Sequence, residues 1–253
     1  MTIPLQDGIV YGPVRSRRLG ASLGVNILPD ARKVCNFNCP YCQYGWTPLD
    51  AQGSALTEAS WPPAGEVARA VEDALAQGGV VDRITLAGNG EPTLHPDFAT
   101  IVERLREVRD RRAPSARLAI LSNASTVSDP AIAAALVRHD ERYMKLDAGD
   151  DATLLALNGS RVPIGRIVEG LARLKGVTLQ SMFTRDTRGK IDNTTAAALH
   201  HWLAAVQRVG PSAVHVYTID RSPAWKHLDA VPRAELEQIA DRVRALSIDA
   251  MVF

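Results

Sequence analysis

Residues 35–42 read Cys35-Asn-Phe-Asn-Cys39-Pro-Tyr-Cys42 and contain all three cysteines of the 253-residue chain. Thiols spaced by four and three residues can wrap a compact metal centre. Three protein ligands are one fewer than a closed structural zinc site or a fully protein-bound iron–sulfur cube requires. The spacing therefore predicts a centre with one open coordination position. Two alternatives stay open: a zinc site completed by one of the six histidines, and thiols that only pack in the interior.

The composition is that of an ordinary globular protein. Hydrophobic residues make up 46% of the chain and charged residues 23%, which is enough for a full core without disulfides. The 29 Lys and Arg against 28 Asp and Glu leave a net charge of +1, so no overall field draws the protein to nucleic acid or to an anionic membrane. The N-terminus lacks signal-peptide features, and no run approaches the roughly 18 apolar residues of a membrane helix. We expect a cytoplasmic protein with no membrane partner.

Short β-rich runs alternate with segments whose apolar residues recur at helical spacing. Strands are predicted at residues 23–28, 83–87, 118–121, 143–147, 177–183 and 213–219, each followed by a helical segment, with a short edge strand at residues 251–253. Six such units predict a single α/β domain with a parallel sheet and right-handed crossovers. Alternation alone leaves open a doubly wound sheet or an incomplete barrel. In both, ligands bind at the carboxyl ends of the strands.

Polar residues follow several of these predicted strands. The stretch Gly88-Asn-Gly-Glu-Pro-Thr93 ends the second one, where glycines let the backbone approach a ligand and the Glu91 carboxylate suits a cationic amino group. The alternative is a plain turn. Ser122-Asn123 and Lys145-Leu-Asp147 end the third and fourth strands, at the same side as the cysteine loop. A turn cap and a solvated ion pair are the alternatives for these.

The chain resembles the radical S-adenosylmethionine (radical SAM) superfamily, whose signature is Cys-x-x-x-Cys-x-aromatic-Cys, with Tyr41 at the aromatic position. The resemblance implies an enzyme that holds a 4Fe-4S cluster on the three cysteines and binds S-adenosylmethionine at the fourth iron. Reductive cleavage of that cofactor would yield a 5′-deoxyadenosyl radical, which abstracts hydrogen from a substrate. A flavodoxin- or ferredoxin-type protein is the expected electron donor.

The same resemblance implies a set of cofactor contacts. In the family a Gly-Gly-Glu stretch after the second strand binds the methionine amino group, and Asn89 replaces its first glycine here. We attribute this change to the tolerance of Asn for left-handed backbone. The expected cofactor-binding residues are Tyr41, Gly88, Asn89, Gly90, Glu91, Ser122, Asn123 and Asp147.

A narrower resemblance extends over nearly the whole chain. Residues 11–20, 192–194 and 216–221 look like a small single-cluster subgroup that partly resembles the tRNA wyosine-forming enzymes. It implies an incomplete (β/α)6 TIM-like barrel over residues 1–253, with an N-terminal extension at 1–20 and a cluster loop at 33–46. The substrate candidates near the predicted mouth are the polar residues Lys145, Gln180, Tyr217, Asp220 and Arg221. Three further candidates, Arg15, Arg17 and Arg18, could clamp an oxyanion or simply lie on the surface.

The cysteine count also excludes functions. With all three thiols assigned to one cluster, none is left for an auxiliary cluster or a catalytic thiol, and the wyosine-forming enzymes use a second set of cysteines. A tRNA substrate fits poorly with a net charge of +1 and 5% aromatic residues, so a small molecule or a protein is favoured. The alternatives are an activating enzyme for a partner protein, a tRNA-modifying enzyme, or, in another class, an iron–sulfur electron-transfer or metal-sensing protein.

Overall fold

The computed structural model describes residues 2–16, 20–48 and 61–253, so Arg17 and Arg18 lie outside the described residues. A sheet of seven parallel strands forms its frame. In spatial order these are β2 (Gly20–Val25), β3 (Arg83–Leu86), β4 (Arg117–Ser122), β5 (Glu141–Lys145), β6 (Val177–Met182), β8 (Ala213–Tyr217) and β10 (Asp249–Val252). Strand β1 (Val10–Ser16) joins antiparallel to β2 at one edge.

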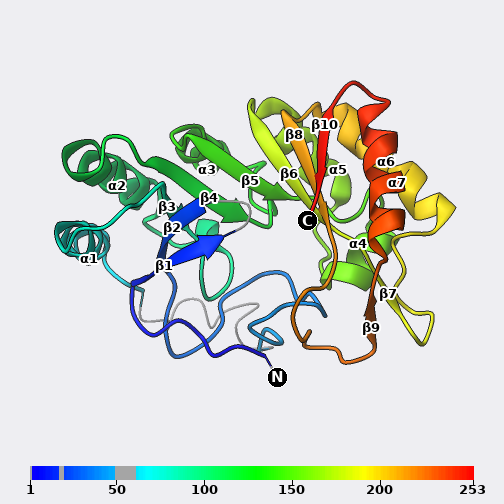
Figure 1. Cartoon of the computed structure of the whole chain (residues 1–253), viewed down its shortest axis with the longest axis horizontal. Coiled ribbons are helices and arrows are strands. Elements are labelled where there is room, and N and C mark those ends of the chain that lie inside the picture. The colour runs from blue at the N-terminus through cyan, green and yellow to red at the C-terminus, as the bar shows by residue number, and fades with distance from the viewer. Residues whose placement is uncertain (1, 17–19, 49–60) are drawn as a thin grey trace.

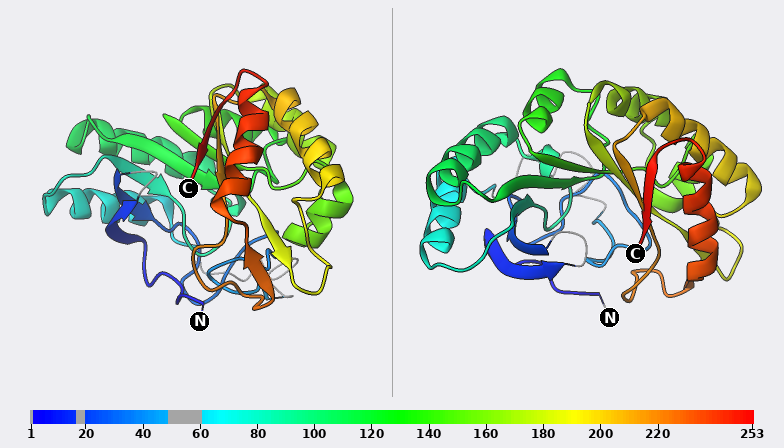
Figure 2. Two further views of the ribbon diagram at one scale, coloured as in Figure 1. Left: turned by 45° about the vertical axis from the view of Figure 1, so that its right-hand side comes forward. Right: turned by 45° about the horizontal axis from the view of Figure 1, so that its top comes forward.

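The sheet curves into an open barrel. Figure 2 shows the strands along the inner side of an arc and the helices along its outer side, and the edge strands β1 and β10 are not paired with each other. The helices are α1 (Ala64–Ala76), α2 (Phe98–Arg112), α3 (Pro130–Val137), α4 (Asp151–Asn158), α5 (Ile164–Arg173), α6 (Ala196–Val209) and α7 (Arg233–Arg244). This confirms the predicted single α/β domain and the incomplete barrel with six strand–helix units.

Several elements differ from the sequence prediction. The first predicted strand, 23–28, ends at Val25, because the Asn26 side chain folds back to bond both the N–H (3.3 Å) and the carbonyl (2.9 Å) of Leu28. The fourth predicted strand, 143–147, spans residues 141–145 instead. Strand β1, helix α4, the 3-10 turn η3 (Pro92–Leu94), and the antiparallel pair β7 (Thr184–Asp186) and β9 (Leu228–Ala230) were not predicted.

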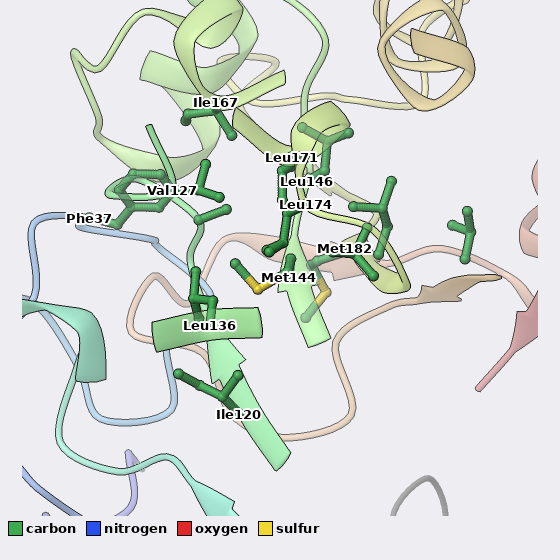
Figure 3. Packing of buried hydrophobic residues seen from close by; sticks show 14 of the residues in the cluster. Phe37, Ile120, Val127, Leu136, Met144, Leu146, Ile167, Leu171, Leu174 and Met182 are labelled. Atoms are coloured by element: carbon green, nitrogen blue, oxygen red, sulfur yellow. The ribbon is translucent and has the colours of Figure 1, made fainter. Parts of the chain in front are cut away.

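The two faces of the sheet differ in chemistry because alternate side chains of a strand point to opposite faces. Toward the helices the side chains are apolar: Figure 3 shows Met144 and Leu146 from the β5 segment packed among Ile167 and Leu171 of α5. The concave face is largely polar. There Ser22 contacts Thr85 (Oγ to Oγ1, 2.7 Å), and Arg83 forms two hydrogen bonds of 2.6 and 3.0 Å with Glu141.

The inside of the arc is therefore lined by groups that can meet a polar ligand. In the described ranges, no helix has the length and apolar character needed to cross a membrane.

Helix α5 offers a matched test of this packing. A Cβ on Gly170 would lie 2.6 Å from Cγ1 of Val127, whereas a Cβ on Gly165 of the same helix meets nothing within 4 Å. We expect Gly170→Ala to lower the free energy of unfolding by about 1–3 kcal/mol through overpacking. Gly165→Ala should raise it by about 0.4–1 kcal/mol by restricting the unfolded chain. Urea unfolding measures both, and equal effects would contradict the packing.

Candidate cofactor and metal site

Backbone pairing holds the cysteine loop against the end of β3. The N–H of Val34 donates to the carbonyl of Asn89 (2.8 Å), and the N–H of Glu91 donates to the carbonyl of Val34 (2.9 Å). A Cβ on Gly90, whose φ is +144°, would lie 1.7 Å from the Val34 oxygen, so glycine is required there. The glycines were predicted to let the backbone approach a ligand. In the structure, the group that approaches the backbone at Gly90 belongs to the chain's own cysteine loop.

A second asparagine supports the same motif from β2. Asn26, which is 1% exposed, accepts a hydrogen bond from the N–H of Asn89 at 3.1 Å. A Cβ on Gly88 would lie 2.4 Å from its Oδ1 atom. Sequence analysis missed Asn26, although an asparagine inside an apolar strand run is a signal that could have identified it.

Asn89 does not adopt left-handed backbone, so the expected reason for its replacing glycine is wrong. Among the described residues other than glycine, only Ala124 and Ser247 have a positive φ. Its side chain is instead bound to the N-terminal segment: Oδ1 accepts from the N–H of Gln6 (2.8 Å), and Nδ2 donates to the carbonyls of Gln6 and Pro29 (3.0 Å each). Asn89 therefore fastens residues near the N-terminus beside the cysteine loop.

The three thiols have different surroundings. Cys35 and Cys39 are buried, whereas Cys42 is partly exposed. Asparagine amides point at the buried sulfurs, from Asn123 to Cys35 Sγ at 3.7 Å and from Asn158 to Cys39 Sγ at 3.3 Å. Burial, followed by the charges of Cys39 and Glu91, raises the pKa of Cys35 to about 12, and burial also raises that of Cys39. Across the described part of the chain, no three His, Cys, Asp or Glu side chains are placed to hold a metal together.

The Glu91 carboxylate joins the ends of β3 and β4. Its Oε1 accepts from the N–H and hydroxyl of Thr93 (3.1 and 2.7 Å) and from the Ser122 hydroxyl (2.8 Å), and its Oε2 accepts from the N–H of Asn123 (2.5 Å). Three of these donors converge on Oε1 and one reaches Oε2, so in the described part of the chain Oε2 keeps one acceptor position. Burial raises the pKa of Glu91, while these donors act in the opposite direction. Glu91 thus orients Ser122 and Asn123.

A buried polar network lies behind Tyr41. Its hydroxyl donates to the Asp147 carboxylate, and Asn158 Nδ2 lies 2.7 Å from that hydroxyl and 2.9 Å from Asp147 Oδ2. Lys145 Nζ is 3.4 Å from Asp147 Oδ2 and 5.0 Å from the centroid of the Tyr41 ring. Burial and then the charge of Asp147 raise the pKa of Tyr41. Lys145, whose side chain is 20% exposed, therefore forms an ion pair with a buried Asp147.

The pKa of Lys145 reflects two opposing effects. Burial lowers it, but the charge of Asp147 together with Tyr217 and Cys39 outweighs burial, so the ammonium pKa lies above its ordinary value. Lys145 therefore carries a positive charge next to the cysteine loop. Asn158, at the end of the unpredicted helix α4, was missed by sequence analysis because Leu154 and Leu157 are too few apolar positions to mark a helix.

Most of the substrate candidates lie at the carboxyl ends of the strands, whereas Arg15 does not. Lys145 and Gln180 occupy matched positions on β5 and β6, and the hydroxyl of Tyr217 on β8 lies 3.5 Å from Lys145 Nζ. Arg221, which follows β8, donates to Gln43 of the cysteine loop at 3.2 Å, and the neighbouring Asp220 is exposed. These residues gather at the carboxyl ends of the strands.

Arg15 does not belong to this group. It is exposed on β1 opposite Ala21, near the start of β2, whereas the cysteine loop follows the end of β2. The antiparallel pairing of β1 carries it toward the other end of the barrel. An oxyanion clamp at the mouth therefore gains no support from Arg15.

Comparison with known proteins places this geometry in a family. A family model of the radical SAM superfamily matches residues 33–186. A UPF0026 protein of Helicobacter pylori is 30% identical over 224 residues, which is 86% of this chain and 68% of the relative. The chain belongs to the radical SAM superfamily and, within it, to the UPF0026 proteins. It spans 32% of a Brachyspira hyodysenteriae protein called GTPase Obg, to which it is 27% identical over 231 residues.

Solved structures share the fold. Streptococcus suis SuiB bound to S-adenosylmethionine superposes with a TM-score of 0.63 at 14% identity, covering 91% of this chain and 50% of SuiB. TYW1 with a lysine–pyruvate adduct bound superposes with a TM-score of 0.62 at 14% identity, covering 88% of this chain and 73% of TYW1. The resemblance to radical SAM enzymes and the class of enzyme are thus confirmed.

The role of Asn89 can be tested with the glycine that the family carries at this position. Asn89→Gly removes three hydrogen bonds to the partly buried backbone of residue 6 and the buried carbonyl of residue 29, so we expect a loss of about 1–3 kcal/mol in the free energy of unfolding. Limited proteolysis should then cut first within residues 2–8. Unchanged stability and an unchanged cleavage pattern would show that Asn89 does not hold this segment.

Proposed function

We propose that the protein holds a 4Fe-4S cluster on Cys35, Cys39 and Cys42 and cleaves S-adenosylmethionine reductively to start hydrogen abstraction from a substrate. The observation that carries this proposal is the docking of the three-cysteine loop, through Val34, onto the Gly88–Glu91 stretch at the carboxyl end of β3. When bound, the cluster would supply the electron, and the cofactor would supply the hydrogen-abstracting carbon. A cytoplasmic location and a flavodoxin- or ferredoxin-type electron donor belong to the proposal.

The chemistry of the donor set fits such a cluster. Iron–sulfur clusters are held by Cys thiolates and tuned by hydrogen bonds to sulfur. The loop supplies three thiols, and amide donors from Asn123 and Asn158 reach two of them. The chain has no fourth cysteine, so one iron keeps a position for the cofactor. The arrangement favours an open cluster over a closed metal site.

Two layers of residues support the proposed cofactor site. The first layer consists of the Gly88–Gly90 backbone at the end of β3 and of Ser122 and Asn123 at the end of β4. Glu91 orients these neighbours, since it accepts hydrogen bonds from the Ser122 hydroxyl and the N–H of Asn123. Tyr41 and Asp147 stabilise the loop from behind by their mutual hydrogen bond. These residues position the cofactor and exclude water from it.

The concave face supplies the proposed substrate contacts. Lys145, Gln180 and Tyr217 share that face close to the cysteine loop, and Asp220 and Arg221 follow at the end of β8. A positive charge and neutral hydrogen-bonding groups there suit a polar or anionic small molecule, or a side chain of a protein substrate. The net charge of +1 favours these classes over tRNA.

Replacing Cys39 tests the cluster. Because the chain has only three cysteines, Cys39→Ala leaves two thiols and no other cysteine to replace the lost one. After anaerobic reconstitution, the wild-type protein should contain about four irons per chain and form 5′-deoxyadenosine from S-adenosylmethionine with dithionite. The variant should lose both. Equal iron in the variant, or tetrahedral zinc in the native protein, would overturn the proposal.

Glu91→Gln tests the cofactor side. In the variant, the side-chain amide places an N–H against groups that donate to the carboxylate in the wild type. Asn123 is therefore misoriented. We expect weaker binding of S-adenosylmethionine by about tenfold, since one charge-assisted hydrogen bond contributes roughly 1.5–3 kcal/mol. The iron content should stay at the wild-type value. Equilibrium dialysis with labelled cofactor measures the affinity, and wild-type affinity would exclude this role.

A further inference from the structure

The Lys33 ammonium is buried beside the cysteine loop. The residue is 4% exposed, and its Nζ donates to the carbonyl of Gly45 at 2.7 Å. The ion pairs recorded among residues 2–16, 20–48 and 61–253 do not include it, whereas the ammonium of Lys145 is paired with Asp147. Taking an ammonium out of water is unfavourable unless a negative charge compensates it. The fold therefore keeps a positive charge here at a cost.

The position of Lys33 indicates what compensates this charge. Residues 33 and 45 lie on either side of the three cysteines, so the hydrogen bond to Gly45 closes the base of the cysteine loop. Lys33 stands two residues before Cys35, the first of the three thiols. The loop whose base Lys33 closes thus carries three thiols, which become negatively charged thiolates when they bind a metal. The Glu91 carboxylate, by comparison, accepts from neutral donors of Thr93, Ser122 and Asn123.

We propose that Lys33 is a positioning residue that raises the reduction potential of the proposed cluster by holding a positive charge at the base of the cysteine loop. This role rests on the proposed function. A cluster with thiolate ligands becomes more negative when it takes up an electron, and a buried cation nearby favours that more negative state. Net charge and local electrostatics are among the factors that set cluster potentials.

Three substitutions at Lys33 separate charge from hydrogen bonding. Lys33→Arg keeps both, Lys33→Gln keeps an N–H donor for Gly45 without the charge, and Lys33→Met removes both. Lys175→Met is the matched control. Lys175 is exposed and lies between the end of α5 and the start of β6. Each protein is reconstituted anaerobically as the full chain, assayed for iron and sulfide, and titrated with dithionite while electron paramagnetic resonance reports the reduced fraction.

We expect Lys33→Gln and Lys33→Met to lower the equilibrium constant for one-electron reduction by about tenfold, which corresponds to about 59 mV. Their iron content should match the wild type. Lys33→Arg and Lys175→Met should keep the wild-type potential. The readout is a potential and does not depend on turnover.

The other outcomes have equally defined meanings. A wild-type potential in Lys33→Gln would overturn the proposal and leave Lys33 only its hydrogen bond to Gly45. If Lys33→Met fails to fold, Lys33→Gln and Lys33→Arg still decide between charge and hydrogen bonding. If the wild type itself takes up no iron, the proposed function fails and this role fails with it. A wild type with four irons and an unshifted Lys33→Gln rejects the role of Lys33 alone.

Discussion

The pairing of Val34 with the Asn89–Glu91 backbone is the contact on which the rest of the site depends. It places a loop with three thiols at the carboxyl end of a parallel sheet, and it requires a glycine at position 90 because the Val34 oxygen occupies the space of a side chain. Backbone hydrogen bonds fix the loop in direction as well as in distance. The sulfurs, the Glu91 carboxylate and the end of β4 are thereby brought together, although Asn123 is 32 residues from Glu91 and 88 residues from Cys35 in the chain.

Around this contact the protein satisfies its own buried polar groups. Glu91 and Asp147 each receive several donors from the chain, and Asn26, Asn89 and Asn158 act as connectors between segments. Buried carboxylates and amides are stable only when they are hydrogen-bonded, so such networks make the arrangement rigid. Residues that a motif would assign to direct ligand contact, such as Glu91 and Asp147, therefore also hold the framework together.

Much of the architecture was predictable because hydrophobic periodicity reports directly on burial. Six strand–helix units, the cysteine loop and the gathering of Ser122, Asn123 and Lys145 at one end all follow from it. The antiparallel β1 was missed because residues 10–16 contain Gly12 and Pro13, which weaken a strand pattern. Helix α4 was missed because its apolar stripe is short. The placement of Arg15 at the far end depends on the direction of β1, which periodicity does not report.

The sequence by itself determined the class of protein, since the cysteine spacing and the alternation of strands and helices are local patterns that survive without coordinates. It also determined that one cluster at most can be thiolate-bound by this chain. Only the tertiary structure decided which polar side chains are free for ligands and which are used by the protein. Hydrogen-bond partners such as Asn89 with Gln6, or Asn158 with Cys39, are more than 80 residues apart, and only folding brings such distant groups within reach.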